Sequence, residues 1–391
     1  MGVAVVAWHF WWRGELLACT PRRWYFYYLG ALLVVTVVVA PWPRLATVVL
    51  SLAALEAGFG IGSRAFERLG LSQSSLLPAN GWADTRFTWH PLLQAVPIPT
   101  PADEPSPGIR HNSQKLRGQE RTPESLAGKT VVALFGGSTT YDQANRDGDT
   151  WPERLEVLLR PSHHAVINHG MGGYSSAEHV IQTAFYPSAF GRQPECAIYY
   201  MGWNDARNAH IPDLDPGYAD FHLPSQIDAE EARRIGGQPY SISPTLLYLT
   251  RLVVLAVDTA RPPSWPTGPL RSDPDPALEA IYARNIATIS AINRQRGIRT
   301  VWVGQVLNVA LLATLPPSPW TPRVHSSDLW VMVERLNDVM RREAARLGDV
   351  YIQVAVDAFA PGDFVDEGHF NAQGALKFAT AIAPQVAKAC P

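Results

Sequence analysis

A serine stands where a hydrophobic run gives way to glycines, a pattern that suits nucleophilic chemistry. Gly136-Gly137-Ser138 follows the β-branched stretch 130–134. A strand–turn–helix junction of this kind places the hydroxyl at the C-terminal end of a strand, where open α/β sheets bind ligands. The backbone N–H groups of the following helix then face developing negative charge. Ser138 is therefore a candidate nucleophile.

A serine hydroxyl is a weak nucleophile at neutral pH and needs an adjacent base. The segment Asp366-Glu367-Gly368-His369 near the C-terminus offers one. His369 is the candidate base. Asp366, three residues earlier, is close enough to receive the other imidazole N–H and fix the tautomer.

Two further segments offer hydrogen-bond donors for an oxyanion. Each follows an apparent strand: Gly173 ends the glycine-rich segment 168–173, and Asn204 lies in Gly202-Trp203-Asn204-Asp205. The Asn204 amide and the backbone N–H groups of Gly173 and Ser138 are the predicted oxyanion hole. A glycine suits this position because it lets the backbone approach a substrate closely.

In order, the four segments resemble the blocks of the SGNH hydrolases, also called the GDSL-like lipase/acylhydrolase family. Ser138 falls on the block I serine, although the block reads Gly-Gly-Ser-Thr-Thr here and not Gly-Asp-Ser-Leu. Gly173 falls on the block II glycine, while Gly170 and Gly172 leave its register open. The resemblance covers roughly residues 128 to 388.

The later blocks match more completely. Asn204 falls on the block III asparagine in an intact Gly-x-Asn-Asp, and Asp366 and His369 fall on the Asp-x-x-His of block V. The resemblance implies that the serine, glycine, asparagine and histidine are catalytic and that no metal or organic cofactor is needed. Beside Asn204, we expect Trp203, Asp205 and Arg207 to contribute to substrate binding.

From residue 128 onward, apparent strands and helices alternate, which predicts a parallel sheet. The expected class is α/β, a three-layer sandwich around a central parallel five-stranded sheet with the flavodoxin-like SGNH fold. The predicted strands lie at 131–135, 165–168, 197–201, 300–306 and 350–354. The predicted helices lie at 151–159, 177–185, 277–296, 328–347 and 373–389.

The N-terminal part, residues 1–63, is expected to be a membrane anchor of one or two helices. The stretch 24–40 carries no charge, and aromatic residues gather at its start, as they do at membrane interfaces. A second apolar stretch, 45–63, is interrupted by Glu56, which is costly inside a bilayer. A buried core helix is the alternative interpretation of the first stretch.

The side of the membrane depends on the number of spans. Two spans would put the catalytic domain beside the N-terminus, and the flanking arginines would then favour the cytoplasm. One span would put it outside. Residues 90–118 are similar to the lead-in of membrane-anchored bacterial SGNH proteins, whose hydrolase domain is extracytoplasmic. We therefore expect a bacterial inner-membrane protein with its catalytic domain outside.

The rest of the chain divides into a proline-containing connector, 64–127, and the hydrolase-like domain, 128–391. A long insertion at about 206–275 interrupts that domain directly after the predicted oxyanion asparagine. It contains Tyr218, Phe221 and Tyr240, too many aromatic residues for a simple flexible linker. We expect the insertion to shape the acyl-acceptor side of the site.

Composition excludes several classes of protein. Hydrophobic residues make up 47% and charged residues 17% of the chain, so it can bury a core and is not a disordered protein. The net charge of −2 gives no support for nucleic-acid binding. The three cysteines, Cys19, Cys196 and Cys390, have neither metal-site spacing nor an obvious disulfide framework. The histidines, His163, His164 and His169 among them, are expected in loops and not at a metal.

The sequence thus predicts a membrane-anchored serine esterase or acylhydrolase. Its substrate would be an acyl or acetyl ester of an envelope carbohydrate or lipid. Two alternatives stay open: an O-acyltransferase on a cell-envelope polysaccharide that uses the same triad, and a non-catalytic binding module with this fold. A binding module has no need for Ser138, Asn204, Asp366 and His369 together. The oligomeric state is not predicted.

Overall fold

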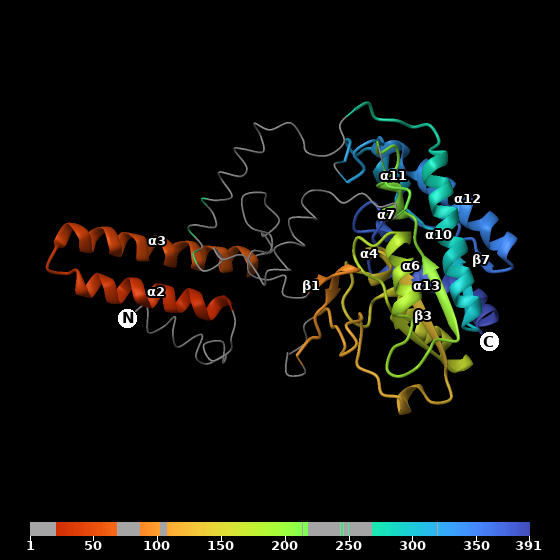
Figure 1. Cartoon of the computed structure of the whole chain (residues 1–391), viewed down its shortest axis with the longest axis horizontal. Helices are drawn as coiled ribbons and strands as arrows, with labels where there is room; N and C mark the ends of the chain where they lie inside the picture. The colour runs from red at the N-terminus through yellow and green to blue at the C-terminus, as the bar shows by residue number, and fades with distance from the viewer. Residues whose placement is uncertain are drawn as a thin grey trace. The chain divides into compact units, whose positions relative to one another are not determined.

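A computed structural model of the chain describes residues 21–68, 87–101, 108–212, 214–217, 243, 245, 249, 268–318 and 320–391 (Figure 1). These residues divide into two compact units. One comprises the positions up to Phe87 with those in the range 231–264, and the other comprises the rest, from Thr88 to 230 and from Trp265 to the C-terminus.

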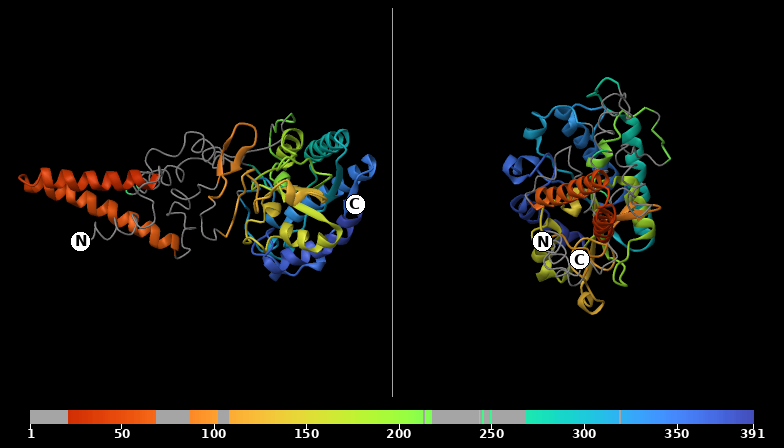
Figure 2. Two further views of the ribbon diagram at one scale, coloured as in Figure 1. Left: turned by 90° about the horizontal axis from the view of Figure 1, so that it is seen from below. Right: turned by 90° about the vertical axis from the view of Figure 1, so that its left-hand side faces the viewer.

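The larger unit is built on a parallel five-stranded sheet covered by helices on both faces (Figures 1 and 2). Along the sheet the order is β4-β3-β5-β6-β7, so β3, the first of these five strands in the sequence, lies second from the edge. The strands are β3 (Thr130–Gly136), β4 (His164–Asn168), β5 (Cys196–Tyr200), β6 (Arg299–Val303) and β7 (Val350–Ile352). The predicted α/β three-layer sandwich is confirmed.

Long helices form the two outer layers, and short helices follow the strand ends. The long ones are α5 (Trp151–Leu159), α6 (Ser176–Phe185), α10 (Pro276–Gln295), α12 (Leu329–Leu347) and α13 (Ala372–Ala389). The short ones are α4 (Ser138–Tyr141), α7 (Trp203–Ala206) and α11 (Val309–Leu312).

Alternation along β3 explains why the sheet is covered on both sides. Val132 and Leu134 pack into the core that α5 and α13 share with the sheet. Ala133 and Phe135 point the other way, into the core formed with α10 and α12. Because successive strand residues face opposite sides, a strand buried on both faces must be apolar throughout, as this one is.

The helix ends follow the local sequence. The N-cap of α6 is Ser175, whose side chain and that of Glu178 form a reciprocal capping box. Asp275 caps α10 by accepting from two backbone N–H groups, and Pro276 occupies the first turn, where it costs no hydrogen bond. Gly348 ends α12 in the left-handed conformation, with φ +75°.

Part of the segment predicted as a connector packs into the larger unit. It contains a two-stranded sheet, β1 (Phe87–His90) with β2 (Gln94–Pro97). Farther along, Arg117 forms an antiparallel bridge with Asn168 of the edge strand β4. Leu126 is fully buried. This segment therefore covers an edge that would otherwise expose unpaired backbone groups.

A disulfide joins Cys196, the first residue of β5, to Cys390 just after α13. The two Cα atoms are 5.6 Å apart although 194 residues separate them in the sequence. This corrects the expectation of no disulfide framework. Spacing along the chain carried no signal, because the fold alone brings the two cysteines together.

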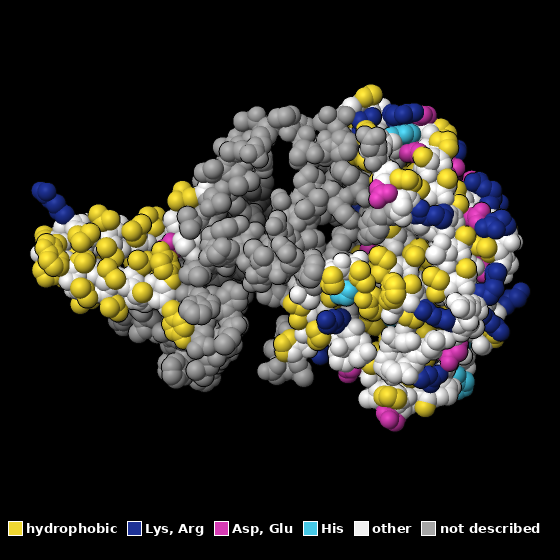
Figure 3. All heavy atoms as spheres, viewed as in Figure 1, with side chains coloured by type: hydrophobic (Ala, Val, Ile, Leu, Met, Phe, Trp, Pro, Cys, Tyr) yellow, Lys and Arg dark blue, Asp and Glu magenta, His cyan; other side chains and the backbone are white. Residues whose placement is uncertain are grey.

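The smaller unit contains two helices that lie side by side, α2 (Pro21–Val38) and α3 (Pro43–Arg68) (Figures 1 and 2). Hydrophobic side chains cover their exposed surface (Figure 3). The carboxylate of Glu56 is instead buried and accepts a hydrogen bond from the Tyr28 hydroxyl at 3.4 Å. This pair therefore exposes apolar side chains and buries a carboxylate, which is the reverse of what a helix pair in water favours.

By length and composition, one segment among the described residues could cross a membrane, Pro43–Gly60 of α3. The apolar part of α2, Tyr27–Val38, is shorter. Of the two apolar stretches expected to cross the membrane, the second, 45–63, thus meets the length and composition of a span better than the first. Most of the insertion, with Tyr218, Phe221, His222 and Tyr240, lies outside the described residues.

Candidate active site

Ser138 and His369 meet at the C-terminal end of the sheet although 231 residues separate them. Ser138 is the first residue of α4, directly after β3, and Gly137 is the N-cap of that helix. The Ser138 Oγ lies 2.8 Å from the His369 Nε2. As the first residue of a helix, Ser138 also has a backbone N–H with no intrahelical acceptor.

Asp366 orients the other side of the imidazole. Its Oδ2 lies 2.7 Å from the His369 Nδ1, and its Oδ1 accepts the backbone N–H groups of Gly368 and His369 at 2.9 and 2.7 Å. Burial opposes ionisation of Asp366, but the hydrogen bond and charge of His369, with these backbone donors, lower its pKa below the usual value. With the Nδ1 proton directed at Asp366, Nε2 is free to accept the Ser138 proton.

Two contacts hold the loop that carries His369. The backbone N–H of Asn308 donates to the carbonyl of Glu367 at 2.9 Å. Gly368 lies against the indole of Trp203, which is 7% exposed. Trp203 therefore supports the histidine loop from α7. Its contact with substrate stays a prediction.

Asn204 lies next to the nucleophile turn. Its Nδ2 donates to the Tyr174 carbonyl at 2.8 Å, and a Cβ placed on Gly137 would be 2.4 Å from the same nitrogen. Only glycine thus lets the amide come so close to the backbone before Ser138. One amide hydrogen is used by Tyr174, which leaves the second for another acceptor.

The block II glycines have separate positions. Gly173 has φ +85°, and its backbone N–H has no acceptor among the described residues. A Cβ on Gly172 would be 3.9 Å from the Ser138 Cβ, so this peptide also borders the nucleophile. At Gly170 a Cβ would be only 2.4 Å from the Tyr141 nitrogen, which makes this glycine a packing requirement of α4.

Asp205 and Arg207 are both buried beside the site. Asp205 accepts from the backbone and hydroxyl of Ser176, which connects α7 to the start of α6. Burial raises the pKa of Asp205 and the Ser176 hydrogen bonds lower it. Burial has the larger effect, so the resulting pKa is about 6. The Arg207 Nη2 is 3.4 Å from the Gly173 carbonyl, and its guanidinium stacks 4.8 Å from the Trp320 ring centroid. Asp205 thus contacts the start of α6, and Arg207 contacts the glycine loop.

Sequence reasoning missed the polar residues behind the nucleophile turn. Asp142, in the left-handed conformation after α4, accepts from the Trp151 backbone and from the Asn145 amide. The same amide reaches the carbonyl of Phe370. The available signal was their closeness to Ser138 in the sequence, but nothing in the sequence pointed to Phe370.

In the described part of the chain, no three His, Cys, Asp or Glu side chains are grouped as metal ligands. His169 is enclosed against Phe135, with ring centroids 4.8 Å apart, and burial lowers its pKa to about 4. His164 Nε2 contacts the carbonyl of Cys390. These two histidines of the predicted loop cluster thus lie in the core.

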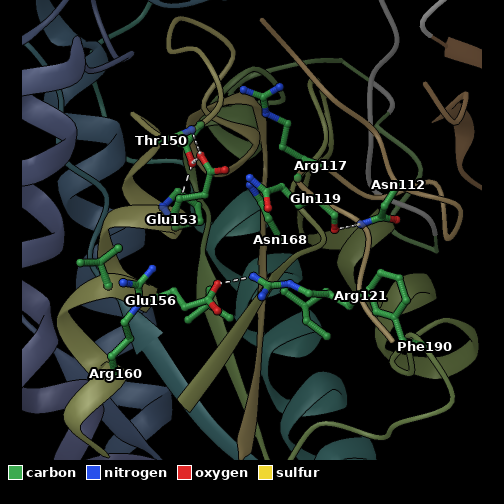
Figure 4. Close-up of a pocket in the computed structure, with 16 residues that line it drawn as sticks. Asn112, Arg117, Gln119, Arg121, Thr150, Glu153, Glu156, Arg160, Asn168 and Phe190 are labelled. Carbon is green, nitrogen blue, oxygen red and sulfur yellow. Dashed lines mark hydrogen bonds and ion pairs between the residues drawn. The ribbon is translucent and has the colours of Figure 1, made fainter. Parts of the chain in front are cut away.

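A polar pocket lies beside the edge strand β4, between α5 and residues 112–121 (Figure 4). Arg121 and Glu156 form an ion pair across it, at 2.5 Å. Neither Ser138 nor His369 lines this pocket. It is separate from the serine–histidine pair.

Similarity to known proteins identifies the family of the chain. The family model of the GDSL-like lipase/acylhydrolase family matches residues 134–376, more than half of the chain. No curated protein matches the chain.

Among solved structures, a GDSL-like lipase from Bacteroides thetaiotaomicron is similar at 10% identity and a TM-score of 0.37. The match covers 69% of this chain and 92% of that one. LAE5, an alpha/beta hydrolase enzyme from the metagenome of Lake Arreo, Spain, is similar at 15% identity and a TM-score of 0.38, covering 68% and 96%. At these TM-scores the two structures add nothing to the assignment, which rests on the family model. The chain belongs to the GDSL-like lipase/acylhydrolase family of ester-hydrolysing serine enzymes.

Proposed function

We propose that Ser138 is the nucleophile of a serine esterase and that His369 and Asp366 complete its triad. The observation that carries the proposal is the Ser138–His369–Asp366 chain of contacts, 2.8 and 2.7 Å long. Ser138 Oγ attacks the ester carbonyl while its proton passes to His369 Nε2. Collapse of the tetrahedral intermediate expels the alcohol, which takes that proton and leaves an acyl-enzyme.

Water then resolves the acyl-enzyme by the reverse proton path. His369 accepts a proton from water, the hydroxide adds to the acyl carbon, and Ser138 leaves with the proton returned. The negative oxygen formed in each step is stabilised by the Asn204 amide and by the N–H groups of Gly173 and Ser138. Asn204 and Gly173 support this assignment because each has a donor not used within the described structure.

Labelling with a fluorophosphonate probe tests the nucleophile. The full-length protein should be labelled once, on Ser138, and Ser138→Ala should not be labelled. Ser290→Ala is a control for loss of a serine elsewhere, because Ser290 is a buried serine of α10, away from the triad. Labelling of Ser138→Ala at the wild-type rate would disprove the assignment.

We infer that the substrate is an acyl or acetyl ester of an envelope carbohydrate or lipid, because a membrane anchor would hold the site near such molecules. Hydrolase and O-acyltransferase differ in whether water or a sugar hydroxyl attacks the acyl-enzyme. Incubation with an aryl acetate and an added oligosaccharide separates them. Free acetate as the only product supports hydrolysis, and an acetylated sugar supports transfer.

The helix pair of the smaller unit supports membrane anchoring. Its apolar exposed surface is the kind that lipid covers, and Glu56 faces inward, as ionisable groups in membrane bundles do. Washing membranes with carbonate should leave the full chain bound. Release by high salt alone would refute a spanning anchor.

We propose further that the catalytic unit lies outside the cytoplasm, since structural disulfides such as Cys196–Cys390 form mainly in oxidising compartments. The arginines flanking α2 and α3 favour the opposite side if both helices span. The disulfide is the more direct indication because it belongs to the catalytic unit itself. A C-terminal reporter that is active only outside the cytoplasm should be active, and a silent one would contradict this location.

A further inference from the structure

The Asn145 side chain connects the two halves of the serine–histidine pair. Its Nδ2 donates to the Asp142 Oδ1 at 2.8 Å and to the Phe370 carbonyl at 3.0 Å. Asp142 directly follows the helix that begins with Ser138, and Phe370 directly follows His369. One buried amide thus joins segments that are 225 residues apart in the sequence.

On the serine side, Asp142 is fixed tightly to the nucleophile turn. Its backbone N–H donates to the Ser138 carbonyl at 2.8 Å, and its Oδ2 accepts the Trp151 backbone N–H at 2.7 Å. The Trp151 indole in turn donates to the Thr139 carbonyl at 2.8 Å. A non-glycine residue at φ +58° is uncommon, and these bonds show what holds Asp142 there.

On the histidine side, the carbonyl groups of His369 and Phe370 each accept a hydrogen bond. That of His369 accepts the Val365 N–H at 2.9 Å, within the loop itself. That of Phe370 accepts the Asn145 amide, which belongs to the serine side. The second bond thus ties the histidine loop to the serine side in addition to its contacts with Asn308 and Trp203. Its loss would let the loop shift relative to the serine while the loop stays internally intact.

Asn145 is itself held by Arg117, from the segment before the family domain. The Arg117 Nη2 donates to the Asn145 carbonyl at 3.0 Å, and Nη1 pairs with Asp147 at 2.9 Å. Its guanidinium lies 5.4 Å from the Tyr141 ring centroid. Although Arg117 lines the pocket of Figure 4, its guanidinium points away from the Arg121–Glu156 pair there.

We propose that Asn145 is a positioning residue, which sets the distance between Ser138 and His369 by bridging Asp142 to Phe370, and that Arg117 fixes Asn145 in place. This inference rests on the proposed serine mechanism. Its physical basis is that proton transfer needs the two groups within hydrogen-bond reach, so that a displacement of about 1 Å costs about 10²-fold in rate. It also gives Arg117, which lies before the family domain, a role in supporting the active site.

The first test compares Asn145→Ala with Asn293→Ala in the full-length protein on an aryl acetate. Asn293 is a matched control, since its buried amide also makes two hydrogen bonds, to Tyr199 and to Thr300 near the start of β6, and contacts neither Ser138 nor the histidine loop. Asn145→Ala should lower kcat by about 10- to 100-fold with little change in KM. Asn293→Ala should keep the wild-type kcat, even if its melting temperature falls as far as that of Asn145→Ala.

The double variant Asp142→Asn/Asn145→Asp separates positioning from simple stability. The new amide at position 142 can still accept from Trp151 and donate to the new carboxylate at position 145, so the link behind the turn is restored. Neither side chain then donates to the Phe370 carbonyl. The melting temperature should therefore exceed that of Asn145→Asp, while kcat stays as low as in that variant.

Recovery of kcat together with the melting temperature would overturn the positioning role, as would a wild-type kcat in Asn145→Ala. Turnover by the wild type and its loss in Ser138→Ala check the underlying mechanism in the same assay. If the wild type is active but Asn145→Ala is unimpaired, only the positioning role is lost. If the wild type has no turnover, the proposed function fails and this inference fails with it.

Discussion

Gly368 and Trp203 are in such close contact that only a glycine fits. A Cβ placed on Gly368 would be 2.4 Å from the Trp203 Cζ3, well inside van der Waals contact. Gly368 directly precedes His369, and Trp203 directly precedes Asn204. The contact therefore connects the loop that supplies the proposed base to the helix that supplies the proposed oxyanion donor.

Gly368→Ala should lower kcat by about 10²-fold, because the added methyl must push either His369 or the Trp203 helix out of place. Kinetics on an aryl acetate measure this. Gly362→Ala in the same region is the control, since a Cβ there meets nothing within 4 Å. Shortening the indole with Trp203→Leu in the Gly368→Ala background should recover part of the rate. Wild-type kcat in Gly368→Ala would show that the loop tolerates the methyl group.

Asn204→Ala should reduce kcat by about 10²–10³-fold, the usual cost of one oxyanion donor. KM should change little, because the hydrogen bond strengthens mainly in the transition state. Steady-state kinetics on small aryl acetates measure both constants. A tenfold rise in KM with unchanged kcat would instead make Asn204 a ligand of the ground-state substrate.

Much of the sheet was predictable because its strands are short apolar runs bounded by glycine and polar residues. The run before Ser138 became β3, and helix α5 begins and ends where the sequence indicated. β6 is shorter than predicted, since it ends at Val303 and Gly304 interrupts the apolar run. Local pattern thus located the elements, and the strand ends then located Ser138 and Asn204.

What the sequence did not reveal depends on contacts between distant segments. The Asn145–Phe370 hydrogen bond and the Cys196–Cys390 disulfide each join residues about 200 positions apart. Trp203, Asp205 and Arg207 were expected to face substrate because they flank Asn204. In the structure all three are buried, and each contacts a neighbouring loop or helix. Their contacts with substrate stay a prediction.

Asp142 should make the catalytic unit less stable as the pH rises from about 4 to about 7. Burial raises the pKa of Asp142, and hydrogen bonds from Trp151 and Asn145 lower it. Burial has the larger effect, so the resulting pKa is about 7. Since the folded state holds the proton through a range in which the unfolded chain has lost it, the stabilisation is complete below about pH 4 and is lost as the pH approaches 7. The slope is at most about 1.4 kcal/mol per pH unit.

Melting temperatures of the wild type and Asp142→Asn across this range test the prediction. Other buried groups, such as His169 and Asp205, titrate in both proteins, so the difference between the two curves isolates Asp142. The advantage of the wild type over the variant should shrink from pH 4 to pH 7 and stay constant above. A difference that is independent of pH would mean that Asp142 is ionised throughout.

The disulfide should stabilise the catalytic unit without affecting its chemistry. Cys196 begins β5, whereas Ser138 follows the C-terminal end of the parallel neighbour β3, so the disulfide lies at the opposite end of the strands from the triad. Cross-linking residues 194 positions apart restricts the unfolded chain strongly, and its loss should cost about 2–5 kcal/mol of unfolding free energy. Cys196→Ser/Cys390→Ser should therefore melt at a lower temperature, yet hydrolyse an aryl acetate with the wild-type kcat at temperatures where it is folded.

The double variant is preferred to either single one, which would leave a free thiol in the core. A fall in kcat of tenfold or more in the folded double variant would show that the C-terminal helix transmits strain to the site. An unchanged melting temperature would show that the two cysteines are not joined in the protein.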